Sequence, residues 1–206
     1  MSYKNLSHAD HGFSLIEMLL VLTIISAIIV GTFVFYPRVR DSAASREEAG
    51  HITALLTEVR QLYPSGNYGE LISDDLVGGT SLPSDYYFSP SDPNNSYSGA
   101  VLSNRWGAAI EAYPVQSDGT RLAPSPGSTA SMFAIRYWGL TPSVCRYLAS
   151  HLIRDSHALM IDDGPVDGVL LVARNTYEGV DEDPSAIAQG CRENNGQKPR
   201  LIVISH

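Results

Sequence analysis

Two hydrophobic patterns follow one another in the first third of the chain. From Met18 to Tyr36 the sequence is uncharged and almost continuously apolar. A helix needs about 20 such residues to cross a bilayer. After Pro37, apolar residues recur at the spacing of a single helix face. These residues are Ile52, Leu55, Leu56, Val59 and Leu62.

The charged positions of the second pattern agree with this reading. The faces opposite the apolar stripe are predicted to hold Arg46, Glu47, Glu48, Glu58 and Arg60. The sequence thus predicts one long helix from about Ser14 to about Tyr63. Its first half is apolar all round, and its second half has one apolar face that needs a partner surface.

Residues 64–206 predict a globular domain of mixed structure. Turn-forming residues dominate as far as Asn104. Strand candidates follow at 105–115, 132–138, 168–174 and 200–205, and the last two are continuous apolar runs expected at the centre of a sheet. Thr141 before Pro142, and Asp183 before Pro184, predict the starts of two short helices. This order predicts an α+β fold in which the long helix packs on an antiparallel β-sheet.

Charge and cysteine content narrow the possible functions. The net charge is −8, and residues 64–206 contain nine basic and sixteen acidic side chains. Such an acidic domain argues against a surface that binds nucleic-acid phosphates. Cys145 and Cys191 are either two buried thiols or one disulfide, and a disulfide is favoured if the domain lies outside the cytoplasm.

The apolar segment is predicted to be retained as an anchor, because no small-residue cleavage site follows it. Glu17 near its start is unexpected, since a carboxylate at the centre of a span costs about 2.5–3.5 kcal/mol. Arg38, Arg40 and Arg46 follow the segment. The positive-inside tendency would place that side in the cytoplasm.

The stretch "GFSLIEMLLVLTIISAIIV" resembles the start of a type IV prepilin. The resemblance implies a leader of residues 1–12 that a prepilin peptidase removes between Gly12 and Phe13, with methylation of the new Phe13 amine. It also implies a pilin fold, with a membrane and filament-core helix half at 13–36, an amphipathic half at 37–63 and a head domain at 64–206. In this family Glu17 would pair with the terminal amine of a neighbouring subunit during assembly.

The distal sequences "GLTPSVCRYLA" and "GCRENNGQKPRLIVISH" are similar to the C-terminal halves of type IVb pilins. Examples are the bundle-forming pilin and the thin-pilus pilins of conjugative plasmids. The resemblance implies a disulfide between Cys145 and Cys191. Two features depart from the IVb pattern: the leader is short, and Phe13 is the first residue more usual in type IVa pilins.

The resemblance implies a structural subunit of a bacterial type IV pilus. Its expected partners are other copies of itself, the prepilin peptidase and the inner-membrane assembly machinery. The precursor would lie in the inner membrane with its head in the periplasm, before joining an extracellular filament. A minor pilin, a type II secretion pseudopilin, and a membrane-anchored periplasmic enzyme or binding protein stay open as alternatives. Adhesion, conjugation, motility and secretion are not distinguished.

The sequence contains no nucleophile elbow, P-loop, dinucleotide fingerprint or H-E-x-x-H motif, so no enzyme, cofactor or metal is expected. His151, Asp155 and His157 are expected to be solvated polar residues. The acidic stretches 162–167 and 181–183 miss the EF-hand pattern and are expected to be turns, with a calcium site left open.

Overall fold

The computed structural model describes residues 14–77, 82–87, 102–116, 119–162, 170–176, 178–192 and 198–206. Helix α1 (Leu15–Leu62) crosses the boundary between two compact units, Met1–Arg40 and Asp41–His206. Each unit is described by itself below. The long helix predicted from about Ser14 to about Tyr63 is therefore confirmed, and it continues through Gly31 and Pro37 without interruption.

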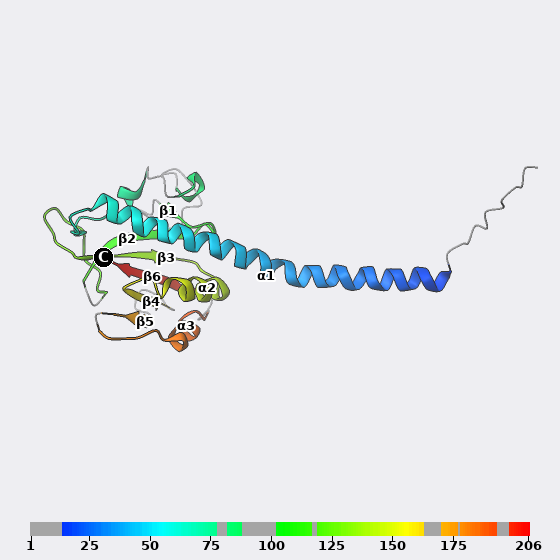
Figure 1. Ribbon diagram of the computed structural model, residues 1–206. Coiled ribbons are helices and arrows are strands. Elements are labelled where there is room, and N and C mark those ends of the chain that lie inside the picture. Colours follow the sequence, from blue (N-terminus) through cyan, green and yellow to red (C-terminus); the bar gives the residue numbers. More distant parts are fainter. Residues whose placement is uncertain are drawn as a thin grey trace, which may run out of the picture. The chain divides into compact units, whose positions relative to one another are not determined.

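The second unit is built on one antiparallel sheet of six strands (Figure 1). The strands are β1 (Leu102–Ser103), β2 (Ala109–Val115), β3 (Met132–Tyr137), β4 (Ala158–Asp162), β5 (Leu170–Asn175) and β6 (Arg200–Ser205). Their order across the sheet is β1-β2-β3-β6-β4-β5. The last strand in the sequence therefore lies at the centre, paired with β3 on one side and β4 on the other.

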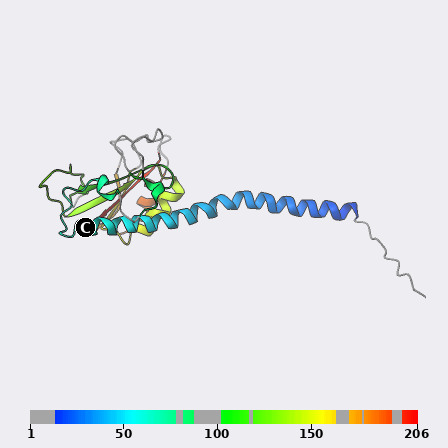
Figure 2. The ribbon, with the colours of Figure 1, turned by 90° about the horizontal axis from the view of Figure 1, so that it is seen from above.

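Helices cover one face of this sheet. The part of α1 from Asp41 onward lies along the strands, as Figures 1 and 2 both show. It packs with α2 (Pro142–Leu152) and α3 (Pro184–Gly190) into a single core. From the sheet, alternate residues such as Phe133, Ile135 and Val203 enter this core. The long helix thus has the partner surface that its apolar stripe requires.

Both short helices begin as the sequence predicts. Thr141 is the N-cap of α2 and accepts a hydrogen bond from the Val144 amide. Asp183 is the N-cap of α3, and its carboxylate accepts from the Ser185 and Ala186 amides. Proline occupies the first helical position in each case, where its missing N–H costs nothing.

Two short 3₁₀ helices, η1 (Ser73–Leu76) and η2 (Ser84–Tyr86), follow α1 in the sequence and precede the first strand. Leu71, Leu76, Leu82 and Tyr86 from this turn-rich region are buried in the core. At the far end of α1, the guanidinium of Arg60 donates to the His206 carbonyl at 2.7 Å and to the Ser205 hydroxyl at 2.5 Å. The end of α1 is thus fastened to the end of β6.

The opposite face of the sheet carries a second, smaller apolar cluster. It includes Met132, Ala134, Met160, Ile202 and Ile204. The backbone near Gly119 lies directly on it, because a Cβ at that position would stand 2.5 Å from the Met160 methyl. Gly119 also has a φ of 85°, which only glycine adopts freely.

Some predictions about the strands are wrong. β5 was expected at the centre of the sheet and lies at its edge. Its apolar run reflects partners on both faces, since Ala173 lies in the helix-covered core while Val172 packs against the second cluster. Burial of two faces does not determine where a strand lies across the sheet. β1 and β4 were not predicted, and the strand predicted to start at residue 105 begins at Ala109.

Candidate assembly segment

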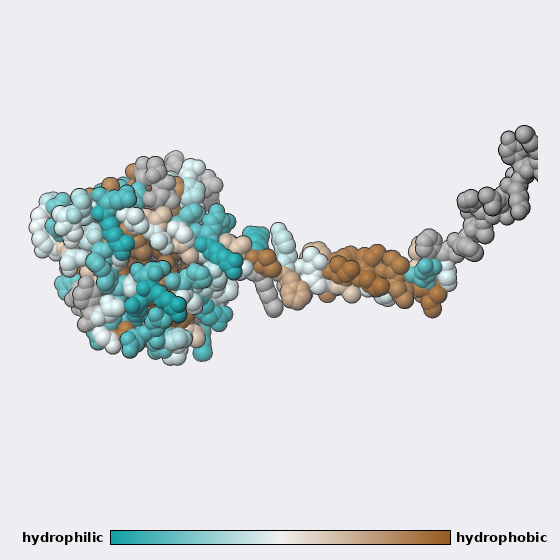
Figure 3. Space-filling model, in the orientation of Figure 1, coloured by the Kyte–Doolittle hydropathy of each residue, from teal (hydrophilic) through white to brown (hydrophobic). Residues whose placement is uncertain are grey.

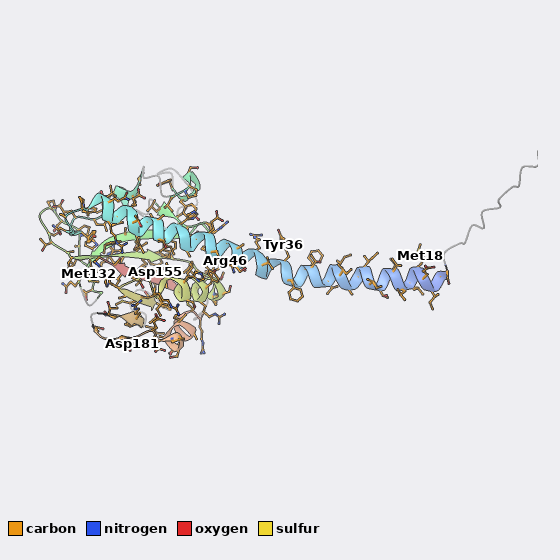
Figure 4. All side chains as sticks on the ribbon, in the orientation of Figure 1. Met18, Tyr36, Arg46, Met132, Asp155 and Asp181 are labelled. Atoms are coloured by element: carbon orange, nitrogen blue, oxygen red, sulfur yellow. A yellow bond between two sulfur atoms is a disulfide. The ribbon has the colours of Figure 1, made fainter. Side chains whose placement is uncertain are left out.

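The first part of α1 exposes an unbroken apolar surface. The stretch Leu15–Phe33 is long and apolar enough to cross a membrane, and none of it is buried within the protein. Figure 3 shows this surface as a brown band, whereas hydrophilic residues cover much of the visible face of the head. Met18 and Tyr36, which end the uncharged run, are marked on α1 in Figure 4. Such a surface is stable only in lipid or against other apolar surfaces.

Three hydroxyl side chains within this stretch are matched to an apolar environment. Thr23 donates to the Leu20 carbonyl at 2.7 Å, and Ser26 donates to the Leu22 carbonyl at 2.8 Å. Thr32 similarly donates to the Ile28 carbonyl at 2.8 Å. Because each hydroxyl is satisfied by its own helix, none needs water or a neighbouring protein.

Glu17 lies in the first turn of α1, with an exposed side chain. The Ser14 carbonyl accepts hydrogen bonds from the backbone amides of Glu17 and Met18, which begins the helix. A carboxylate in this turn is favoured by the helix dipole. Gly12 and Phe13 lie outside the described residues, so leader cleavage, methylation and the pairing of Glu17 stay predictions.

The amphipathic part of α1 buries the stripe that the sequence predicts. Ile52, Leu55, Leu56 and Val59 are each no more than 3% exposed, while Leu62 at the helix end is 47% exposed. On the opposite faces, Glu47 forms an exposed ion pair with Arg105 at 2.7 Å. That ion pair lowers the pKa of the Glu47 carboxyl.

One charged residue of α1 was assigned to the wrong face. Glu48 was expected to face solvent, but its side chain is completely buried. It precedes Ile52 by four positions and Leu55 by seven, so the same helical spacing that identified the stripe also includes it. The hydroxyl of Tyr86 in η2 donates to the Glu48 carboxyl at 2.5 Å. Burial raises the pKa of Glu48 to about 7.

The expected disulfide is present. Cys145 in α2 and Cys191, directly after α3, are joined with their Cα atoms 5.5 Å apart. Both residues are fully buried. Gly190, the last residue of α3, permits α3 to lie close against β4, since a Cβ there would stand 2.8 Å from the Ile161 side chain on β4. The bond therefore joins two helices where one of them is pressed against the sheet.

The polar clusters that the sequence offered have structural roles. Asp162 forms an ion pair with Arg200 at 3.4 Å. His151 stacks on Tyr147, and the His157 ring lies against that of His206. Among the described residues, no three His, Cys, Asp or Glu side chains are arranged to hold a metal ion. Asp163 and Asp167 lie outside the described residues.

Comparison with known proteins finds one family model, for the prokaryotic N-terminal methylation motif, at residues 7–33. No curated protein matches the chain. Among solved structures it is similar to a type IVb pilin from Salmonella typhi, with 16% identity, 76% of this chain and 96% of that chain covered, and a TM-score of 0.47. It is also similar to TcpA, a type IV pilin from Vibrio cholerae El Tor biotype, with 14% identity, coverage of 81% and 99%, and a TM-score of 0.47. Residues 7–33 thus carry the N-terminal methylation motif of type IV prepilin leaders.

Proposed function

We propose that this chain is a structural subunit of a bacterial type IV pilus, of the IVb branch. One observation carries the proposal: the methylation motif at residues 7–33 runs directly into an apolar helix long enough to cross a membrane. An ordinary anchor needs only the second of these features. The role is structural, and it uses α1 rather than a catalytic site.

In this proposal the same apolar surface acts twice. The precursor is held in the inner membrane by the stretch Leu15–Phe33, with its head in the periplasm. A prepilin peptidase removes residues 1–12 and methylates Phe13. The assembly machinery then transfers the subunit from lipid into a filament whose centre is a bundle of such helices. Burial of apolar surface stabilises both states.

The features of the head fit a filament exposed outside the cell. A disulfide between Cys145 and Cys191 is the kind of crosslink that persists in the periplasm and beyond it. The chain also has a net charge of −8, which keeps surfaces that repeat along a filament soluble. We therefore place the head on the outside of the filament.

Deletion of the gene, followed by complementation, tests this function. We expect cells without the chain to lack one class of thin surface filament, and filaments purified from complemented cells to contain this chain as their main component. Filaments of normal composition that contain only traces of the chain would instead indicate a minor pilin. Loss of protein secretion without loss of filaments would indicate a pseudopilin.

A further inference from the structure

Four basic side chains meet at one end of the sheet in the head. They are Arg60 in the last turn of α1, His157 directly before β4, Arg174 on β5 and His206 directly after β6, here called the basic end cluster. The end of α1 and the C-terminal end of β6 lie side by side in Figures 1 and 2. All four residues belong to the same compact unit, Asp41–His206.

The two histidines hold the centre of this cluster. The Nε2 atoms of His157 and His206 are 3.2 Å apart, and the hydroxyl of Thr176 lies 3.3 Å from His157 Nδ1. The pKa of His157 is lowered by burial and then by His206, Arg60 and Arg174. Because all three basic groups act on this one imidazole, the four side chains lie within electrostatic reach of one another.

The two arginines of the cluster are bound to neutral oxygen atoms. The guanidinium of Arg60 donates to the His206 carbonyl and the Ser205 hydroxyl, and that of Arg174 donates to the Ile153 carbonyl. Within the described part of the chain, neither guanidinium forms an ion pair with a carboxylate. The head residues that do form such pairs are Arg105, Arg121, Arg136, Arg154 and Arg200. Arg60 and Arg174 thus keep an uncompensated positive charge.

This positive charge stands out on an acidic domain. Residues 64–206 contain nine basic and sixteen acidic side chains. Identical acidic heads repel one another when they are brought together, unless opposite charges meet where they touch. In a filament, each contact joins two different surfaces of the same chain. The basic end cluster of one copy can therefore meet the carboxylates of the next.

We propose that the basic end cluster binds carboxylates on the head of a second copy of this chain. The proposal rests on the filament proposed above. Arg60 is exposed, and the two hydrogen bonds that it donates leave further N–H groups of its guanidinium for a carboxylate. The partner carboxylate comes from the exposed acidic residues of the head, which include Glu70, Asp74, Glu178 and Asp181.

Zero-length crosslinking in filaments tests this contact. Arg60→Lys keeps the positive charge and introduces an amine, which a carbodiimide joins only to a carboxylate that touches it. Background is low, because the whole chain has two lysines, Lys4 and Lys198, and Lys4 lies in the proposed leader. Sheared filaments that contain both Arg60→Lys and unaltered subunits are expected to give a covalent dimer, with position 60 of one copy joined to an acidic residue of another. Filaments of the unaltered chain should lack this dimer.

Arg146→Lys is the matched control, since Arg146 is exposed on α2 and lies outside the cluster. It is expected to give no dimer beyond that of unaltered filaments. Arg174→Lys places a second amine within the cluster and serves as the probe if Arg60→Lys is not incorporated. At 1 M salt, where screening acts over about 3 Å, the dimer yield from the cluster variants should fall.

Three results would overturn the proposal. The first is filaments that contain Arg60→Lys or Arg174→Lys and give no dimer above the unaltered background. The second is a crosslink from these positions to carboxylates of the same copy alone. The third is an equal dimer yield from Arg146→Lys, since crosslinking would then not depend on the cluster. Cells that make no filaments from the unaltered chain would instead contradict the proposed function, so the two failures are distinguishable.

Discussion

Glu17 is the one charged residue between Phe13 and Tyr36. Its position in the first turn of α1 lowers the cost of its charge in two ways. It lies near the end of a membrane span, where insertion of a charge costs less than at the centre. If the leader is removed, the new amine of Phe13 stands four positions before Glu17 in the sequence, a spacing that would bring the two charges onto one face if the helix extends to Phe13. Inside a filament, an unpaired carboxylate there would cost several kcal/mol.

The variant Glu17→Gln is therefore expected to be inserted and cleaved but largely unassembled. Immunoblots of membrane and sheared-filament fractions would measure this, with Glu178→Gln, a change at an exposed head residue, as the matched control. Mixed with the unaltered subunit, the variant should be poorly incorporated. Filaments of normal number and length made from Glu17→Gln alone would show that charge pairing does not guide assembly.

Leu55 and Leu62 provide a matched pair on the apolar side of α1, since one is completely buried and the other is 47% exposed. Leu55→Ala is expected to lower the free energy of unfolding of the head by about 2–5 kcal/mol, through lost apolar contact and a cavity. Leu62→Ala should change it by about 0.5 kcal/mol or less. Urea unfolding followed by the fluorescence of Trp106 and Trp138 measures both, and equal losses would argue against α1 packing on the sheet.

At the scale of elements, α2 and α3 depend on each other through one covalent bond. α3 has only seven residues and would be marginal alone. Its stability comes from its Asp183 cap, its contact with β4 at Gly190 and the disulfide that follows it. If one of these three contacts is removed, the position of α3 depends on the other two.

The double variant Cys145→Ser, Cys191→Ser is expected to lose about 4 kcal/mol of stability, because the bond closes a loop between residues 46 apart. Urea unfolding of the full chain would measure the loss, and reduction of the unaltered protein should reproduce it. Thiol labelling of the unreduced, denatured protein checks the bond itself. Two reactive thiols in protein isolated from filaments would refute the prediction.

At the scale of the whole molecule, the mature chain is expected to begin at Phe13 with a methylated amine. The methylation motif at residues 7–33 includes this junction. Intact mass and N-terminal sequencing of protein from peptidase-competent cells would show both changes. Gly12 replaced by a bulky residue should leave an uncleaved precursor in the membrane. A mature mass that still includes residues 1–12 would exclude this processing.

Much of this molecule could be predicted from local pattern. The uncharged run, the stripe from Ile52 to Val59 and the caps at Thr141 and Asp183 each follow from chemistry within a few residues. The features that could not be predicted depend on contacts between residues far apart in the sequence. The helical spacing already assigns Glu48 to the buried stripe, but the hydroxyl that satisfies its carboxyl comes from Tyr86, 38 positions away. The edge position of β5 depends on where β6 pairs, and no pattern within either strand specifies that.

The central place of β6 has a consequence for how the head is made. Before this strand is available, β1, β2 and β3 can pair with one another and β4 can pair with β5, but nothing joins the two groups within the sheet. Strand pairing between distant segments is slow, and the open edges of β3 and β4 invite pairing with other chains. If the head is exported from its N-terminal side, as proposed above, β6 is delivered after the other strands that the structure describes. A chaperone that shields those two edges during delivery would therefore act at the step where the head is most vulnerable.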